Sequence, residues 1–109
     1  MSRSDYEIAP EDLRHKMDAG HTFVLLDVRR ADEIAQAALP NALHIPIEEI
    51  EERVGELNAD DETVVFCHHG VRSLSVAVYL RNRGFRDVTS LAGGIDFWSR
   101  HIDPSVPRY

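Results

Sequence analysis

Cysteine is nearly absent from the sequence: Cys67 is the one cysteine among 109 residues, so no disulfide can form within the chain. A lone free cysteine is typical of proteins that work in a reducing compartment, and we expect a cytoplasmic location. Long hydrophobic runs are also absent, and the first residues contain no apolar segment like that of a secretory signal. These absences predict a protein with no membrane partner.

Positive charge is scarce as well. The chain has 12 Lys and Arg residues against 19 Asp and Glu residues, which gives a formal net charge of −7. Such an acidic protein repels phosphate backbones, so nucleic acid is not an expected partner. The hydrophobic content of 43% is ordinary for a globular protein, and the length suits a single domain over residues 1–109.

Segments of two kinds alternate along the chain. Short apolar runs predict buried strands, and they occupy residues 22–28, 42–46, 62–67 and 87–91. Apolar residues at helical spacing, with start and stop signals, predict helices over residues 10–19, 32–39, 47–57, 74–83 and 95–101. Strands that alternate with helices predict an α/β fold with a largely parallel sheet. Ligands of such sheets bind beyond the carboxyl ends of the strands.

The expected helix at 47–57 has an unusually acidic outer side. Its glutamates outside the apolar stripe are Glu48, Glu49, Glu51 and Glu52. They could form an acidic docking surface, but a solvated helix face is the simpler interpretation.

Cys67 lies at the carboxyl end of one expected strand, where ligands of such a sheet would bind. Gly70 allows a tight turn after it, and the amides of that turn, with a helix that begins near Ser73, can converge on the sulfur. Arg72 adds a cation. These groups favour a thiolate, or a persulfide anion, over a neutral thiol. We therefore predict that Cys67 is a catalytic nucleophile in a substrate-binding loop of His68, His69, Gly70, Val71, Arg72 and Ser73.

Several segments together resemble the single-domain rhodaneses, a family of sulfurtransferases, over nearly the full length of the chain. The matching segments are "LLDVR" at 25–29, "LPNALHIPI" at 39–47, the Cys-x-x-Gly-x-Arg-Ser loop at 67–73 and "LAGGIDFW" at 91–98. The resemblance implies a three-layer fold, with a largely parallel five-stranded sheet flanked by helices and a fifth strand near residues 6–8.

The resemblance also implies a two-step sulfur transfer without a cofactor. Cys67 would take the outer sulfur of a small-molecule donor such as thiosulfate, and then pass it to a small-molecule acceptor such as cyanide or a thiol. Arg72 would hold the anionic donor. Related cell-cycle phosphatases and arsenate reductases have a longer loop between cysteine and arginine. The shorter loop here suits a single sulfur atom, which favours sulfur transfer over phosphate hydrolysis.

A second interpretation is a sulfur-relay or binding module that hands sulfur to a protein. The ending "GGIDFWSRHIDPSVPRY" resembles rhodanese domains fused to enzymes that activate ubiquitin-like sulfur carriers. This resemblance implies a sulfur-acceptor protein without identifying it. The last seven residues, "DPSVPRY", are expected to lie extended on the surface.

Asp27 and Arg29 end a strand near the same edge of the sheet as Cys67. An active-site role is one interpretation. We favour a structural ion pair or loop brace near the site, which Glu33 could join, because partly buried charges need partners. Trp98 is expected to pack in the core.

The adjacent residues His68 and His69 are poor joint ligands for one ion, so no metal site is expected. Residues 30–33 and 37–42 depart from the usual pattern of the family. These departures put the turn geometry and the rim of the site in question.

Overall fold

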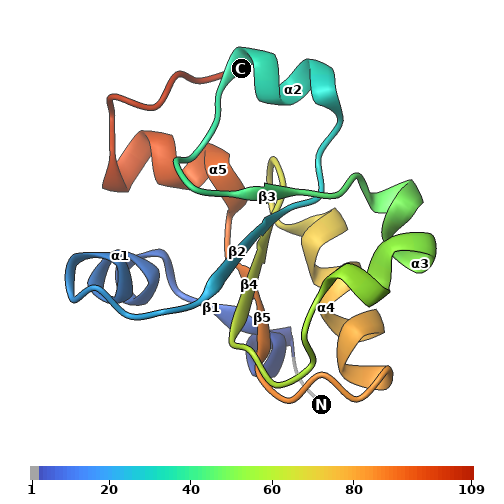
Figure 1. Cartoon of the computed structure of the whole chain (residues 1–109). Helices are drawn as coiled ribbons and strands as arrows, with labels where there is room; N and C mark the ends of the chain where they lie inside the picture. The colour runs from blue at the N-terminus through green and yellow to red at the C-terminus, as the bar shows by residue number, and fades with distance from the viewer. Residues whose placement is uncertain (1–2) are drawn as a thin grey trace.

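The computed structural model describes residues 3–109 and confirms an α/β fold built on a five-stranded sheet (Figure 1). The strands are β1 (Glu7–Ile8), β2 (Val24–Asp27), β3 (Leu43–His44), β4 (Thr63–Phe66) and β5 (Val88–Leu91). Their order is β1-β5-β4-β2-β3, and all neighbouring pairs are parallel. The central strand, β4, therefore delivers Cys67 to the middle of the carboxyl edge.

Helices cover both faces of the sheet. The α-helices are α1 (Pro10–Asp18), α2 (Ala31–Gln36), α3 (Ile50–Arg53), α4 (Val71–Asn82) and α5 (Gly94–Phe97). The other helical segments are the 3₁₀-helical η1 (Arg3–Tyr6), η2 (Ile47–Glu49) and η3 (Val54–Glu56), and the π-helical η4 (Trp98–Ile102). α1 and α5 lie on one side of the sheet and α3 and α4 on the other (Figure 1), which makes three layers. Within residues 3–109, no helix has the length and apolar character needed to cross a membrane.

Two hydrophobic clusters, one on each face, hold the layers together. Alternate side chains of β4 point to opposite faces, so Val64 and Phe66 join the cluster that contains Trp98 of η4. Val65 and Cys67 join the cluster on the α4 side. The pleat of β4 therefore turns the Cys67 side chain toward the first turn of α4.

Several predicted helices have different bounds in the structure, and the helix predicted over 95–101 is divided between α5 and the π-helical η4. The helix predicted over 74–83 begins at Val71, because Gly70 adopts a φ of 98° that lets the chain turn at once into α4. The helix predicted over 32–39 ends at Gln36, and Ala37 is extended. The helix predicted over 47–57 is divided among η2, α3 and η3, whose tighter turns still keep one side against the core.

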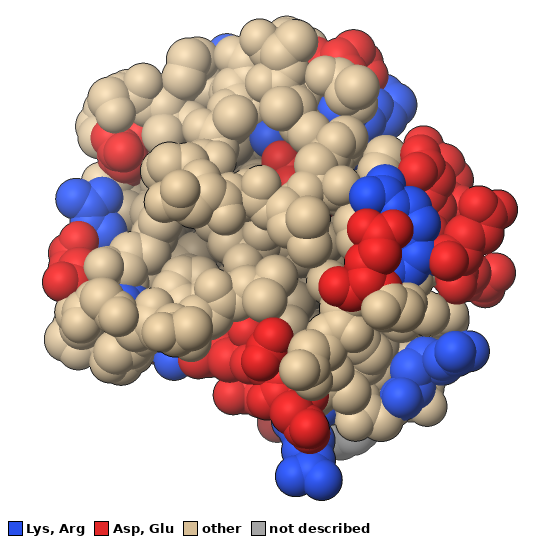
Figure 2. All heavy atoms as spheres, viewed as in Figure 1, with Lys and Arg blue, Asp and Glu red and all other residues tan. Residues whose placement is uncertain are grey.

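The acidic residues of η2, α3 and η3 gather on the outside of the molecule. Figure 2 shows them as a group over α3, on the right of the view. Glu48, Glu51 and Glu52 are exposed, and Glu49 pairs with Arg53 at 3.1 Å. Their exposure agrees with a solvated helix face.

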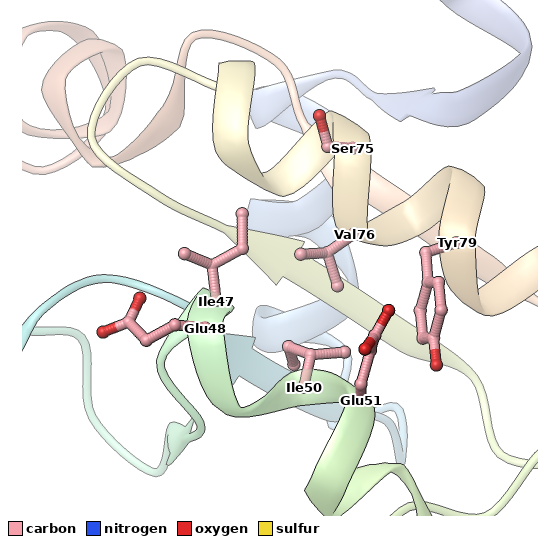
Figure 3. A pocket seen from close by; sticks show the side chains of 7 residues that line it. All are labelled: Ile47, Glu48, Ile50, Glu51, Ser75, Val76 and Tyr79. Atoms are coloured by element: carbon pink, nitrogen blue, oxygen red, sulfur yellow. The ribbon is translucent and has the colours of Figure 1, made fainter.

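A hollow of about 310 Å³ lies between this acidic side and α4 (Figure 3). Its lining residues are Ile47, Glu48, Ile50, Glu51, Ser75, Val76 and Tyr79. In Figure 3, Ile50 of α3 faces Val76 of α4, and Glu51 lies beside Tyr79. Cys67 does not line this hollow, so the hollow is separate from the site that the sulfur occupies.

Candidate active site

Two backbone amides point at the sulfur of Cys67. The N–H groups of Gly70 and Ser73 donate to Sγ, at 3.1 and 3.3 Å. Gly70 ends the turn that leads from β4 into α4, and Ser73 lies in the first turn of α4, so the positive end of this helix also faces the sulfur. Cys67 itself is 1% exposed. This arrangement can stabilise a negative charge on the sulfur or on an atom attached to it.

A pair of serine hydroxyls completes the surroundings of the sulfur. The Cys67 thiol donates to Ser73 Oγ at 3.3 Å, and Ser73 Oγ shares a hydrogen bond of 2.7 Å with Ser90 Oγ. If the thiol loses its proton, the Ser73 hydroxyl can reverse and donate to Sγ while Ser90 donates to Ser73. Ser90 was not expected from the sequence. Its only signal in the sequence is a hydroxyl side chain within a segment that is predicted to be a buried strand.

The first turn of α5 holds the loop in this orientation. The amides of Ile95 and Asp96 donate to the carbonyl oxygens of Cys67 and His68, at 2.9 and 3.0 Å. A side chain on Gly94 would collide with these same carbonyl groups. Because α5 binds the carbonyl groups of the loop, the loop amides that follow are free to turn inward to the sulfur.

The guanidinium of Arg72 is bound to another side chain. The predicted anion-holding role requires a guanidinium that is free to bind the donor. The Arg72 guanidinium donates two hydrogen bonds to the Glu33 carboxylate, at 2.6 and 2.9 Å. The Arg30 amide donates to the same carboxylate at 3.2 Å, and the Tyr109 hydroxyl donates at 2.9 Å. Glu33 was predicted to join Asp27 and Arg29, so its pairing with Arg72 corrects that prediction.

This buried network lowers the pKa of Glu33 from 4.5 to about 2, chiefly because Arg72 hydrogen-bonds the ionised carboxylate. A carboxyl whose pKa is lower in the folded state stabilises the fold above its unfolded pKa. That contribution disappears as the pH falls from 4.5 toward 2. Across this interval we expect the unfolding free energy of the native protein to fall by about 3 kcal/mol more than that of Glu33→Gln. Urea unfolding at a series of pH values compares the two, and parallel curves would contradict the expectation.

Asp27 and Arg29 form the predicted ion pair, in which both carboxylate oxygens of Asp27 are bound. Arg29 Nε and Nη2 donate to the two Asp27 oxygens at 2.9 and 2.7 Å, and the Arg29 side chain is fully buried. Nη2 also donates to the Ala37 carbonyl at 2.9 Å, and Nη1 donates to the Tyr109 hydroxyl at 3.0 Å. The pair thereby ties the carboxyl end of β2 to the segment after α2 and to the tail.

The tail is not simply an extended surface segment, because it returns to the site. Val106 is buried, and the chain end lies beside α2 (Figure 1). Tyr109 lies between Arg29 and Glu33, and its ring stacks on that of His68 with centroids 4.0 Å apart. Burial raises the pKa of Tyr109 to about 12, so its hydroxyl keeps the proton that it donates to Glu33. Sequence reasoning missed this residue, whose one signal is an aromatic ring in a polar tail.

The two histidines of the loop have different environments. Burial, with His69 close by, lowers the pKa of His68, so that this ring is neutral near pH 7. Its Nε2 is buried and has no hydrogen-bond partner among the described residues. His69 is 62% exposed at the mouth of the site. Val71 stands beside the same turn and is 66% exposed.

Asp96 joins the histidines in space, which the sequence did not predict. Metal-ligating atoms of His68, His69 and Asp96 lie within 4.8 Å of one another. Asp96 also faces Arg100 at 3.5 Å, and this cation competes with any metal ion for the carboxylate. Trp98 is 2% exposed and packs in the core, as expected.

The sequence matches the family model "Rhodanese-like domain" over residues 9–101. A sulfurtransferase of Allochromatium vinosum is 37% identical over 92% of this chain and 94% of its own length. The thiosulfate sulfurtransferase GlpE of Coxiella burnetii is 36% identical over 72% of this chain and 73% of its own. The putative sulfur carrier protein YrkF of Bacillus subtilis is 37% identical over 85% of this chain, which spans half the length of YrkF.

Solved structures also include a rhodanese-related protein with a similar fold. A rhodanese-related protein from Thermoplasma volcanium superimposes with a TM-score of 0.80 at 30% identity. The match covers 88% of this chain and 92% of that one.

Proposed function

The chain belongs to the rhodanese-like domain family, and from that premise we propose that it transfers a sulfane sulfur through a persulfide on Cys67. The donor is thiosulfate or a persulfide, and the acceptor is cyanide or a thiol. The relatives support sulfur transfer in general, and the GlpE protein carries the name of a thiosulfate enzyme. The observation that carries the proposal is the pair of amides that converge on Cys67 Sγ.

The proposed reaction uses these two amides. The Cys67 thiolate attacks the outer sulfur of thiosulfate, the sulfur–sulfur bond of the donor breaks, and its electron pair leaves with sulfite. The product is a cysteine persulfide anion, whose charge the Gly70 and Ser73 amides stabilise in place of the thiolate charge. An acceptor thiolate or cyanide then attacks the outer sulfur of the persulfide and returns Cys67 as a thiolate. No step requires a metal or a cofactor.

The remaining loop residues have supporting roles in this proposal. Gly70 permits the turn, His68 forms a neutral wall against Tyr109, and His69 and Val71 line the mouth. Asp27 and Arg29 brace the end of β2. We further propose that residues 1–109 act as one domain in the cytoplasm, where a lone cysteine stays reduced.

Intact-protein mass measurement tests the proposal. After incubation with thiosulfate, and in parallel with a small alkyl persulfide, the protein should gain the mass of one sulfur atom. Cyanide or dithiothreitol should remove it, and cyanide should yield thiocyanate. A protein that gains no sulfur from either donor would overturn the proposed function.

A second candidate is a sulfur relay to a protein acceptor. Val71, one residue from the Gly70 amide that binds the sulfur, is 66% exposed and offers an apolar contact at the mouth. YrkF carries the name of a putative sulfur carrier protein. A relay would load sulfur but turn over cyanide slowly, and adding its protein acceptor would accelerate unloading. Rapid cyanide turnover without any partner favours the enzyme.

A further inference from the structure

The positive charge of Arg72 is paired with the carboxylate of Glu33 in the structure. Both of its terminal nitrogens bind the Glu33 carboxylate, which is only 4% exposed, whereas the Arg72 side chain is 30% exposed. The Arg30 amide and the Tyr109 hydroxyl fix the same carboxylate from two other directions. Glu33 is therefore held in place by its surroundings, and Arg72 is attached to it.

The second guanidinium of this network is also neutralised. Arg29 is buried against Asp27, and Tyr109 connects that pair to Glu33. The pKa of His68 is lowered by burial, so its ring adds no positive charge near pH 7. The Arg30 guanidinium also lies 3.6 Å from Glu33, and its own charge is paired with Asp32 at 2.9 Å. A negative donor that approaches the Cys67 thiolate therefore meets arginines that are each paired with a carboxylate.

Charge separates the two classes of donor. Thiosulfate is a dianion at neutral pH, whereas an alkyl persulfide without other ionised groups carries at most one negative charge. Repulsion from the thiolate and from Glu33 is larger for the dianion, and an engaged Arg72 offsets less of it.

We infer that Glu33 is a specificity-determining residue, which neutralises Arg72 and so makes persulfides better sulfur donors than thiosulfate. This inference rests on the proposed sulfur transfer at Cys67. With a persulfide donor, the thiolate attacks the outer sulfur, the sulfur–sulfur bond breaks, and the donor thiolate leaves with the electron pair. The outer sulfur keeps its proton, if it has one, and the persulfide of Cys67 then releases that proton to solvent.

Glu33→Gln tests the inference, because glutamine keeps the shape of the side chain and removes its charge. Asp32→Asn is the matched control. Asp32 lies in the same helix, α2, and pairs with the exposed Arg30 at 2.9 Å. The substitution also removes one negative charge, but among the described residues Asp32 makes no contact with Arg72 that could be lost. The measurement is kcat/KM at low salt for thiosulfate and for hydroxyethyl persulfide, with cyanide as the acceptor.

We expect native protein and Asp32→Asn to use the persulfide more efficiently than thiosulfate. Glu33→Gln should raise kcat/KM for thiosulfate about tenfold and leave that for the persulfide within about twofold. Added salt should reduce this gain, because it screens a freed cation. A purely structural role for Glu33 predicts no such dependence on donor charge and salt.

Two results would overturn the inference while leaving the proposed function intact. In one, native protein prefers thiosulfate. In the other, Glu33→Gln lowers or leaves unchanged the ratio of thiosulfate to persulfide efficiency, which would make Glu33 a brace for Arg72. Failure of native Cys67 to accept sulfur from either donor would instead contradict the proposed function. Thermal unfolding of each variant shows that the comparison is made on folded protein.

Discussion

Cys67→Ser is expected to abolish sulfur transfer, with a fall in turnover of roughly 10⁴-fold or more. A serine hydroxyl is far less acidic than a thiol and cannot form a persulfide, so the Gly70 and Ser73 amides would have no anion to stabilise. The substitution is small, and the hydroxyl can hydrogen-bond the same amides. We therefore expect the fold to survive it.

Thiocyanate production and intact mass, each measured with thiosulfate and with persulfide, give the readouts. Ser99→Ala is a suitable control, because Ser99 is another buried polar side chain, in η4, whose Oγ has no hydrogen-bond partner among the described residues. This variant should keep its activity. Turnover or sulfur loading in Cys67→Ser would show that the nucleophile lies elsewhere in the chain.

Gly94→Ala is expected to destabilise the protein by more than about 3 kcal/mol. Gly94 has a φ of 63°, which disfavours any other residue, and its new methyl group would collide with the carbonyl groups of Cys67 and His68. Relief of that collision requires α5 and the Cys67 loop to move apart. The hydrogen bonds from Ile95 and Asp96 to the loop would then be lost, and the sulfur site with them.

Gly20→Ala separates the cost of the positive φ from the cost of the collision with the loop. Gly20 has a similar φ of 72°, but a side chain there would meet nothing within 4 Å. It should cost only the backbone strain, about 1 kcal/mol, and leave sulfur transfer unchanged. Urea unfolding of both variants measures the difference, and equal losses would show that the contact of Gly94 with the loop has no energetic importance.

The sequence predicted the parts of the site that depend on neighbours along the chain. The apolar run before Cys67 indicated a buried strand, and the glycine and arginine after it indicated a turn into a helix. These signals are local, since the Gly70 and Ser73 amides lie only three and six residues from the sulfur they bind. α4 begins at Val71, before the predicted start at residue 74, because Gly70 alone completes the turn.

The partners of Glu33 could not be predicted in the same way. Arg72 and Tyr109 lie 39 and 76 residues from it in the chain, and no periodicity relates them. Proximity along the chain favours the ion pair of Asp27 and Arg29 as the partner of Glu33. Only the packing of α2 and the tail over the end of the sheet brings it to Arg72.

The position of β4 affects how the molecule withstands partial opening. The outermost strands, β1 and β3, are two residues long each, so fraying begins most easily at these margins. β4 has a neighbour on each side, and its four residues are all buried. We therefore expect the amide protons of β4 to exchange more slowly than those of β1 and β3. The loop that binds the sulfur follows β4, so it should keep its conformation while the outer strands open locally.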